Sequence, residues 1–259
     1  MKNKKVNKQS EQAAADVQKT EKTEKTEKTP KKIPFAVSEA YKSIRTNLVT
    51  NLAKSNKKII AVSSPYASEG KSTTAINLSI SFAQLNKKVL LIDSDAHRPS
   101  VHTKMKLDNE QGLLNILTGD AAFQDVVKHY SDYLDVLTSG PLVSNPTELL
   151  HSNTLVELFD SLRKDYDYIL VDAPPVNLLS DAQIVAQRSD GMIMLARAGI
   201  TTHDALRRAL NNAKTLYIDV IGIILNGSDY GTKRYYSKYY NKYYNKYYNR
   251  YYNKYYTKY

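Results

Sequence analysis

Short apolar segments alternate with amphipathic ones along residues 57–227, and this alternation constrains the fold more than any other feature of the sequence. Strands are predicted at 57–64, 87–93, 133–139, 167–175, 190–198 and 219–227, and helices at 37–53, 70–85, 147–165 and 202–215. The apolar segments are continuous, so each strand must be covered on both faces. We therefore predict an α/β fold, a mostly parallel sheet with helices on both faces, whose first helix has Ser38 as its N-cap.

The net charge of +11 is carried by the two ends of the chain. Residues 1–34 have a net charge of +5 and residues 230–259 one of +8, whereas residues 35–229 are close to neutral at −2. The Lys-Thr-Glu repeat in 18–32 has no apolar residue to bury, which predicts a disordered basic segment over 1–34. We expect one folded domain over 35–229 and a flexible tail rich in Tyr and Lys over 230–259.

Two absences limit the possible classes of protein. The sequence contains no cysteine, which excludes a disulfide framework and a cysteine-ligated metal site. It also lacks a run of 18 apolar residues and an apolar stretch of the signal-peptide type near its N-terminus. The expected location is therefore the cytoplasm, and association with a membrane would require a partner or the basic ends.

The first loop that could bind a ligand follows the strand at 57–64 and leads into a helix. It contains the run Glu69-Gly70-Lys71-Ser72-Thr73. Gly70 allows the backbone to approach a phosphate closely, and the helix N-terminus directs N–H groups at it. Lys71 can reach the β- and γ-phosphates of a nucleotide, and the Ser72 hydroxyl can ligate Mg²⁺. The strict motif has glycine where this chain has Pro65, and a generic glycine turn is the plain alternative.

Two further loops place carboxylates at the ends of predicted strands. Asp93 and Asp95 close the second strand, and Asp172 closes the strand at 167–175. Two carboxylates two residues apart in a strand face the same side and need a cation or a shared proton, although strand-end caps are the alternative. Because the carboxyl ends of parallel strands meet at one sheet edge, we predict a Mg²⁺–nucleotide site there.

Together these segments resemble the bacterial tyrosine kinases. "EGKST", the strand into Asp93-x-Asp95, and "YILVDAPP" are similar to the Walker A, Walker A′ and Walker B motifs of that family, and the resemblance spans about residues 37–229 plus the tyrosine-rich tail. It implies a P-loop NTPase of the deviant-Walker, SIMIBI-like type that uses ATP and Mg²⁺ to phosphorylate its own tyrosines and regulates capsular and extracellular polysaccharide synthesis and export. The related ATPases that partition DNA or position division sites carry a signature lysine where this chain has Tyr66.

The resemblance implies roles for individual residues. Lys71, Asp93 and Asp95 are the candidate catalytic residues; Glu69, Gly70, Lys71, Ser72, Thr73 and Asp172 the nucleotide-binding ones; and Ser72, Asp93, Asp95 and Asp172 the metal-binding ones. Asp93 is the candidate acceptor of the tyrosine proton, while Asp95 and Asp172 would orient the metal or its water. How Asp93 and Asp95 divide the base and metal roles stays open at this point.

The sequence departs from the family pattern in two places. Walker A′ usually continues Asp-x-Asp-x-Arg, whereas this chain has His97 in the arginine position and Arg98 after it. The family's interface motif Glu-x-x-Arg-x-x-Arg appears as Glu39, Lys42 and Arg45, and spacing by three places these residues on one helical face. Lys42 keeps the charge but not the bidentate fork of arginine. We expect this face to form a ring-like homo-oligomer, with a solvated charged face as the alternative.

The tail places tyrosine pairs four residues apart, separated by Lys or Arg. Its predicted autophosphorylation sites are Tyr235, Tyr236, Tyr239, Tyr240, Tyr243, Tyr244, Tyr247, Tyr248, Tyr251, Tyr252, Tyr255, Tyr256 and Tyr259. A four-residue repeat drifts about 40° per repeat around a helix, so we expect an extended tail that reaches a neighbouring subunit. Roughly five phosphates would cancel its charge of +8, which suggests a graded electrostatic switch.

Partners and rival functions follow from the same features. The resemblance implies recruitment to the inner face of the cell membrane by a transmembrane polysaccharide co-polymerase adaptor that activates the kinase, and a tyrosine phosphatase that resets the tail. Aromatic residues interleaved with basic ones also suit single-stranded nucleic acid, although no nucleic-acid partner is expected with this core. The remaining alternative is an ATP-driven partitioning switch whose basic aromatic tail binds membrane or nucleic acid.

Overall fold

The computed structural model describes residues 35–228, and the predicted tail tyrosines and the basic segment 1–34 lie outside that range. Backbone contacts place residues from Glu39 onward in one unit, to which the contacts below belong. The helices are α2 (Phe35–Ser55), α3 (Lys71–Ala83), α4 (Val101–Met105), α5 (Leu113–Thr118), α6 (Phe123–Val126), α7 (Pro146–His151), α8 (Asn153–Leu162), α9 (Ser180–Arg188) and α10 (His203–Thr215). The strands are β1 (Ile59–Ser63), β2 (Val89–Asp93), β3 (Lys128–Ser131), β4 (Leu134–Leu137), β5 (Tyr168–Asp172), β6 (Gly191–Arg197) and β7 (Val220–Asn226).

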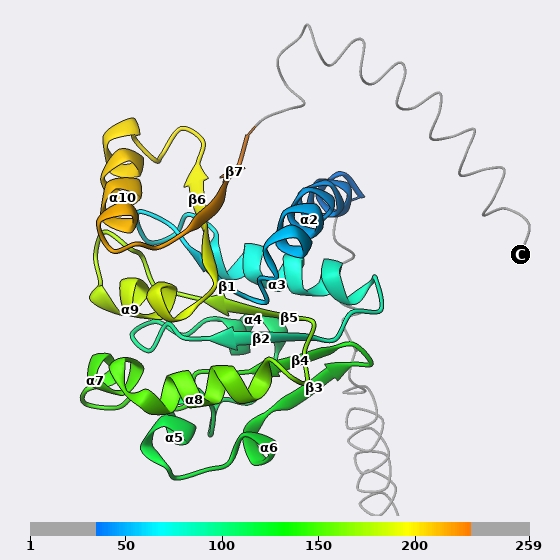
Figure 1. The fold of residues 1–259 in the computed structure, drawn as a ribbon, viewed down its shortest axis with the longest axis vertical. Coiled ribbons are helices and arrows are strands. Elements are labelled where there is room, and N and C mark those ends of the chain that lie inside the picture. Colours follow the sequence, from blue (N-terminus) through cyan, green and yellow to red (C-terminus); the bar gives the residue numbers. More distant parts are fainter. Residues whose placement is uncertain (1–34, 229–259) are drawn as a thin grey trace, which may run out of the picture. The chain divides into compact units, whose positions relative to one another are not determined.

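The strands form one seven-stranded sheet in the order β3-β4-β2-β5-β1-β6-β7. All paired neighbours are parallel except β3, which runs antiparallel to β4 at the sheet edge. In consequence, the loops after β1, β2 and β5 leave the sheet at the same edge (Figure 1). This confirms the predicted α/β fold with a mostly parallel sheet.

Alternate side chains of the central strands enter two separate cores. Ile59 and Ile169 point into one core with α5, α8, α9 and α10, whereas Ile60 and Leu170 point into the other with α2 and α3. Every residue of β1 and β2 is buried, because helices cover both faces (Figure 1). Two-sided burial is the physical reason for the continuous apolar segments seen in the sequence.

Several elements differ from the sequence-based predictions or were missing from them. Helix α2 begins at Phe35, so the prediction of Ser38 as an N-cap is wrong, and Ser38 lies within the helix. The helix predicted at 147–165 is two helices, α7 and α8, which break at the extended backbone of Ser152. The edge strand β3 and the helices α4, α5, α6 and α9 were not predicted at all.

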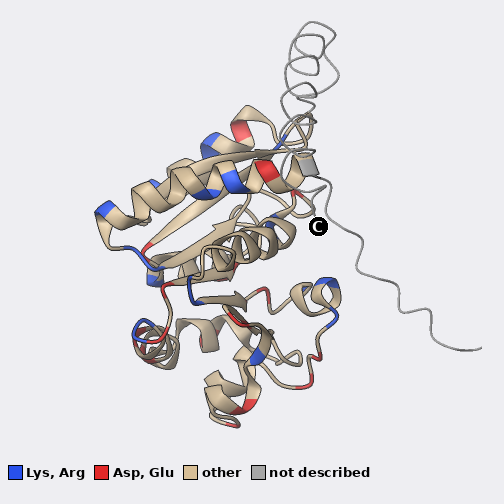
Figure 2. Cartoon of the chain, turned by 90° about the vertical axis from the view of Figure 1, so that its right-hand side faces the viewer, with Lys and Arg blue, Asp and Glu red and all other residues tan. Residues whose placement is uncertain are grey.

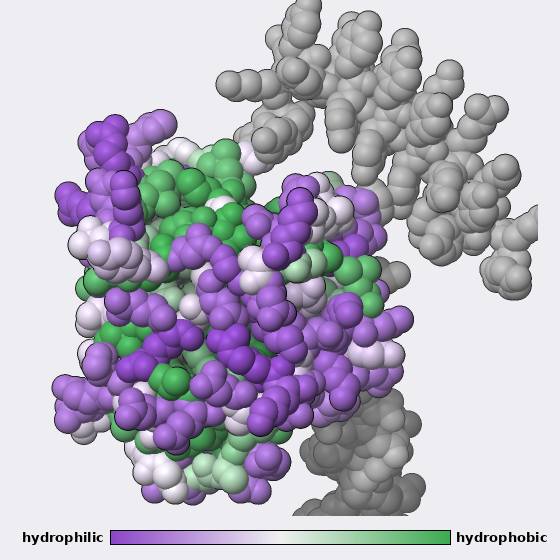
Figure 3. Space-filling view, viewed as in Figure 1, coloured by the Kyte–Doolittle hydropathy of each residue, from purple (hydrophilic) through white to green (hydrophobic). Residues whose placement is uncertain are grey.

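Charged residues of both signs alternate along the described part of the chain, in keeping with the near-neutral charge of 35–229 (Figure 2). Apolar surface gathers around the β7 edge of the sheet, where Ile223 and Leu225 are 50% and 53% exposed (Figure 3). Within residues 35–228, none of the helices combines the length and the apolar character needed to cross a bilayer.

A half-buried carboxylate connects three elements at the opposite end of the strands. Asp190 accepts the backbone N–H groups of Lys58 and Ile59, each at 2.8 Å, and its two oxygens receive the guanidinium of Arg163, also at 2.8 Å. Burial alone would raise the pKa of Asp190, but Arg163 and the two N–H groups outweigh it and hold that pKa below its usual value.

Replacing Asp190 by Ala should lower the free energy of unfolding at pH 7 by about 2–4 kcal/mol, since it leaves partly buried donors without an acceptor. The folded-state pKa is depressed, so this stabilisation is present above the unfolded-state pKa of about 3.9 and is lost as the pH falls through the folded value. Urea unfolding at pH 7 and pH 3.5 measures both effects. Asp160→Ala removes a second, mostly exposed partner of Arg163 and should cost under about 1 kcal/mol. A loss that is equal for both variants, or independent of pH, would refute this account.

Candidate active site

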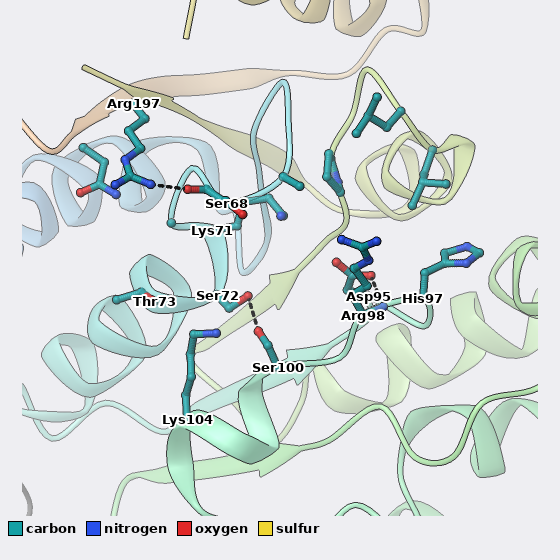
Figure 4. Close-up of a pocket in the computed structure, with 16 residues that line it drawn as sticks. Ser68, Lys71, Ser72, Thr73, Asp95, His97, Arg98, Ser100, Lys104 and Arg197 are labelled. Carbon is teal, nitrogen blue, oxygen red and sulfur yellow. Dashed lines mark hydrogen bonds between the residues drawn. The ribbon is translucent and has the colours of Figure 1, made fainter. Parts of the chain in front are cut away.

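An open cavity of about 730 Å³ lies at the carboxyl ends of the strands (Figure 4). Its walls come from the loop before α3 and the first turn of that helix, the loop after β2, helix α4, the loop after β5 and the ends of β6 and β7. The lining residues are Ala67, Ser68, Gly70, Lys71, Ser72, Thr73, Asp95, His97, Arg98, Ser100, Lys104, Pro175, Leu178, Leu179, Arg197 and Asn226. The structure therefore brings the three predicted loops together around one space, as the parallel-strand argument requires.

The loop before α3 has the geometry of a phosphate cradle. Gly70 caps α3 with φ +102°, and a Cβ at this position would lie 2.2 Å from Nδ2 of Asn226. Only glycine fits here, because both the backbone angle and the space exclude a side chain. The backbone N–H groups in the first turn of α3, which begins at Lys71, have no partner within the helix and are available to an anion.

The two carboxylates of the Walker A′ segment, Asp93 and Asp95, differ in their contacts. Asp93 is fully buried and accepts backbone N–H groups from Asp95 at 3.2 Å and from Ser100 and Val101 at 3.0 Å each. Burial raises the pKa of Asp93 to about 6, against the opposing effect of these three hydrogen bonds. Asp95 lies beyond the end of β2, lines the cavity, and accepts the Arg98 N–H at 3.0 Å. The strand ends at Asp93, as the prediction of a strand at 87–93 has it, and Asp95 lies in the following loop. The expectation that the two carboxylates face one side, which requires both to be in the strand, therefore does not apply.

Asp172 is the least satisfied polar group near the cavity. It ends β5 in register with Asp93, is completely buried, and neither of its carboxylate oxygens has a hydrogen-bond partner among the described residues. Burial and the neighbouring charge of Asp93 raise the pKa of Asp172 well above its usual value, while the nearby Ser72 hydroxyl and then the charge of Lys71 oppose the rise. An unpartnered buried carboxylate is unstable unless a cation or a proton completes it.

This arrangement fits a magnesium ion that is shared with a nucleotide. Asp172 supplies free carboxylate oxygens, and the Ser72 hydroxyl, which accepts a hydrogen bond from Ser100 at 2.8 Å, lies on the cavity wall. Within residues 35–228, no three acidic or histidine side chains converge into a self-contained metal site. Mg²⁺ is commonly held by one or two carboxylates plus substrate phosphates, so such a cage is not required.

Two predicted nucleotide-binding residues, Glu69 and Asp172, are not among the residues that line the cavity, and Glu69 is bound within the protein instead. Glu69 is fully buried. One carboxylate oxygen accepts the Tyr66 N–H at 2.8 Å, and the other accepts the Thr201 hydroxyl. The side chain of Glu69 therefore binds the rest of the protein, and not the cavity.

Two neighbouring residues, His97 and Arg98, stand where the Walker A′ motif has its arginine. Nε2 of His97 lies 2.9 Å from Oδ2 of the buried Asp181 in α9, whose other oxygen accepts the Thr147 hydroxyl at 2.7 Å. Arg98 lines the cavity beside Asp95 (Figure 4). His97 and Arg98 both line the cavity; His97 anchors the loop to α9, and Arg98 adds a positive charge to those of Lys71, Lys104 and Arg197.

Several cavity residues were missed by sequence reasoning, among them the charged Lys104 and Arg197 and the polar Asn226. Arg197 and Asn226 close β6 and β7, so the rule that strand ends form the site could have found them. Lys104 lies in α4, a helix of five residues that is too short to leave a periodic signal.

The predicted interface residues make contacts within their own subunit. Lys42 and Glu39 form a partly exposed ion pair at 2.8 Å, and Arg45 donates to the backbone carbonyl of Ser81 in α3 at 2.6 Å. The predicted role of this helix face in a ring remains a prediction.

Comparisons with known proteins place the chain in a family. The AAA domain family model matches residues 57–219. Tyrosine-protein kinase YwqD of Bacillus subtilis is 38% identical over 201 residues, which cover 75% of this chain and 85% of the relative. Tyrosine-protein kinase CpsD of Streptococcus agalactiae serotype III is 34% identical over 190 residues, or 73% of this chain and 81% of the relative.

Solved structures agree with these relatives. The kinase domain of the Escherichia coli tyrosine kinase ETK has a TM-score of 0.72 and 28% identity, and the match covers 80% of this chain and 85% of that one. The septum site-determining protein MinD of Pyrococcus horikoshii, at 24% identity and a TM-score of 0.57 over 68% of this chain and 72% of its own, shares the fold alone. Because the P-loop cavity, the sequence relatives and the ETK structure agree, the chain belongs to the family of bacterial tyrosine-protein kinases built on an AAA-type, ATP-binding domain.

Proposed function

We propose that this kinase transfers the γ-phosphoryl group of ATP to tyrosines of its own C-terminal segment, with the segment of one subunit entering the cavity of another. The proposal depends on one observation: the same chain carries a phosphate-binding cavity and, from residue 230 onward, 14 of its 21 tyrosines among eight basic and no acidic residues. An extended segment of 30 residues spans roughly 100 Å, which is sufficient to reach a neighbouring subunit.

The cavity residues divide the work of phosphoryl transfer between them. The first turn of α3 and Lys71 bind the phosphates of ATP and offset their charge. A magnesium ion held by Ser72 and Asp172 together with the phosphates would neutralise the charge that develops in the transition state. The tyrosine oxygen attacks the γ-phosphorus, the bond to the β–γ bridging oxygen breaks, and ADP leaves.

We propose Asp95 as the acceptor of the tyrosine proton. Of the two Walker A′ carboxylates, Asp95 alone is among the residues that line the cavity, whereas Asp93 accepts three backbone N–H groups behind the loop. Asp93 then acts by holding the turn that presents Asp95 and Arg98. This supports an assignment in which the proton leaves the tyrosine hydroxyl for Asp95, and Arg98 stabilises the charged groups beside it.

The regulatory setting is part of the same proposal. The family resemblance supports control of capsular or extracellular polysaccharide synthesis, a transmembrane co-polymerase adaptor as activator, and a phosphatase as the opposing enzyme. Each phosphate adds about −1.5 to −2 charges, so roughly five of them would cancel the tail charge of +8. Heavy phosphorylation would then weaken contacts of the tail with anionic lipid and separate subunits whose tails meet.

Intact-mass spectrometry after incubation with Mg-ATP tests this function, with and without the cytoplasmic part of an adaptor. The wild-type chain should gain serial increments of about 80 Da, each one phosphate, on residues 230–259. Lys71→Met should slow this by about 10²-fold or more, because the phosphates lose their cationic partner. Lys87→Met, an exposed lysine at the opposite sheet edge, is the matched control and should be modified like the wild type. If ATP binds, the adaptor is present and the mass stays unchanged, the proposal fails.

A further inference from the structure

The phosphate loop is held in a conformation that its own sequence does not favour. Ser68 has φ +63° and Gly70 has φ +102°, so two residues of the loop lie in the left-handed region. Gly70 adopts such an angle freely, but Ser68 carries a Cβ and does not. A residue of this kind keeps a positive φ only when contacts from the surrounding structure fix it.

Those contacts come from the ends of β6 and β7, far away in the sequence. Arg197 donates from Nη1 to the carbonyl of Ser68 at 2.7 Å (Figure 4), and Asn226 donates from Nδ2 to the carbonyl of Glu69 at 2.9 Å. The Thr201 hydroxyl donates to Oε1 of Glu69. Arg197 and Asn226 also line the cavity and are free to contact a ligand, whereas Thr201 and Glu69 are not among the lining residues.

The direction of the Thr201–Glu69 hydrogen bond follows from its neighbours. The backbone N–H of Arg197 donates to Oγ1 of Thr201 at 2.7 Å, which leaves the hydroxyl proton of Thr201 for Glu69. The other oxygen of Glu69 accepts the N–H of Tyr66 at 2.8 Å. Each oxygen of this fully buried carboxylate therefore has a donor within the protein. Hydrogen bonds to a charged group in a low-dielectric interior are among the strong ones.

We propose that Thr201 is a positioning residue of the kinase reaction: through Glu69 it locks the phosphate loop in its nucleotide-binding form. Glu69 lies in the loop just before Gly70, and its side chain connects two other points. One is the Tyr66 amide at the start of the loop, and the other is Thr201 in the turn after β6. Without the Thr201 hydroxyl, nothing holds the Glu69 carboxylate against that turn, and the loop relaxes towards ordinary backbone angles. Nucleotide affinity then falls, although Thr201 does not line the cavity.

Glu69, the acidic residue in "SEGKST", then supports the loop and does not itself bind the nucleotide. A carboxylate next to bound phosphates would repel them, and the burial of Glu69 removes that charge from the cavity. Its sequence position beside Gly70 led to a predicted role in nucleotide binding, and its contacts support a role behind the loop.

The test measures binding of Mg-ADP to the full chain by isothermal titration calorimetry, together with the melting temperature. Thr201→Val removes the hydroxyl at nearly constant shape and should weaken Mg-ADP binding by about tenfold, the loss expected for one strong hydrogen bond. Thr201→Ser keeps the hydroxyl and should bind within about twofold of the wild type. Thr202→Val is the matched control, because Thr202 caps α10 by accepting the Ala205 N–H and does not contact the phosphate loop. It should lower the melting temperature while leaving affinity unchanged.

Three results would overturn the proposal. They are an unchanged Mg-ADP affinity in Thr201→Val, an equal loss of affinity in Thr202→Val, or a Thr201→Ser variant that binds as weakly as Thr201→Val. If Thr201→Val does not fold, Glu69→Gln/Thr201→Val takes its place, since it leaves no buried charge without a partner, and it should bind about tenfold more weakly than Glu69→Gln. Binding of Mg-ADP is independent of which tyrosines are phosphorylated, so failure here is distinguishable from failure of the proposed function.

Discussion

Replacing Asp172 by Asn should make the protein more stable and inactive at the same time. The carboxylate is completely buried without a hydrogen-bond partner among the described residues, and its charged form is disfavoured by burial and by Asp93. Asparagine has no charge to desolvate, so we expect a gain of about 1–3 kcal/mol in the absence of nucleotide. For a domain of this size that corresponds to roughly 2–4 °C in melting temperature per kcal/mol.

The gain should depend on pH with a definite sign. The folded-state pKa of Asp172 lies well above its unfolded value, so the folded state binds the proton more tightly. Stability from this group is present at low pH and is lost as the pH rises from the unfolded value through the folded one. Melting temperatures of Asp172→Asn and wild type should therefore diverge at pH 8.5 and converge near pH 4.5. Autophosphorylation should fall by about 10²-fold or more, since the residue proposed to hold the metal loses its charge.

Asp181 offers a matched control for this substitution. It is also buried and also follows a loop at the cavity edge, but each of its oxygens has a partner, His97 and Thr147. Asp181→Asn should therefore destabilise the fold by about 1–3 kcal/mol. If Asp172→Asn destabilises like Asp181→Asn, or keeps wild-type activity, the proposal that Asp172 holds the metal is wrong.

Gly70→Ala should abolish measurable nucleotide binding. The added Cβ would lie 2.2 Å from Nδ2 of Asn226, whose amide bonds the Glu69 carbonyl, and the backbone would have to keep φ at +102°. Relief requires a shift of the loop that directs N–H groups at the phosphates. We expect Mg-ADP affinity to fall by about 10²-fold or more and the free energy of unfolding by about 2–4 kcal/mol, as measured by calorimetry and urea unfolding.

Gly119→Ala separates the two effects in Gly70→Ala. Gly119 ends α5 with φ +84°, and a Cβ there has no atom within 4 Å. Its substitution by alanine therefore adds only the strain of the backbone angle, about 1 kcal/mol, and should leave Mg-ADP binding intact. Binding by Gly70→Ala within about threefold of the wild type would show that the loop tolerates the side chain and would refute the proposed fit.

The sequence predicts the central sheet well because its strands are buried on both faces. Segments such as 57–64 and 87–93 have no polar alternation, so their assignment did not depend on knowledge of the tertiary contacts. The edge strand β3 has the sequence Lys-His-Tyr-Ser, is largely exposed, and leaves no such signal. The break between α7 and α8 at Ser152 left no sign in the sequence either, because the two helices continue one apolar pattern.

The site was predictable as a set of loops, but not as a set of side-chain directions. Asp93, Asp172 and Lys71 follow parallel strands, and topology alone brings such positions to one edge. That Asp93 faces backbone N–H groups depends on the path of residues 94–101, and that Glu69 faces Thr201 depends on a turn over a hundred residues away. Interactions at such separations follow from the fold and not from local sequence.

The most direct measurement mixes two full-length variants with Mg-ATP and weighs each chain. One is the inactive Lys71→Met with its tail intact, and the other is catalytically intact with every tail tyrosine from 230 to 259 replaced by Phe. Transfer between subunits predicts serial increments of about 80 Da on the Lys71→Met chain only, and none when either variant is incubated alone. An unmodified Lys71→Met chain, under conditions in which the wild type is phosphorylated, would contradict the claim that one subunit phosphorylates the tail of another.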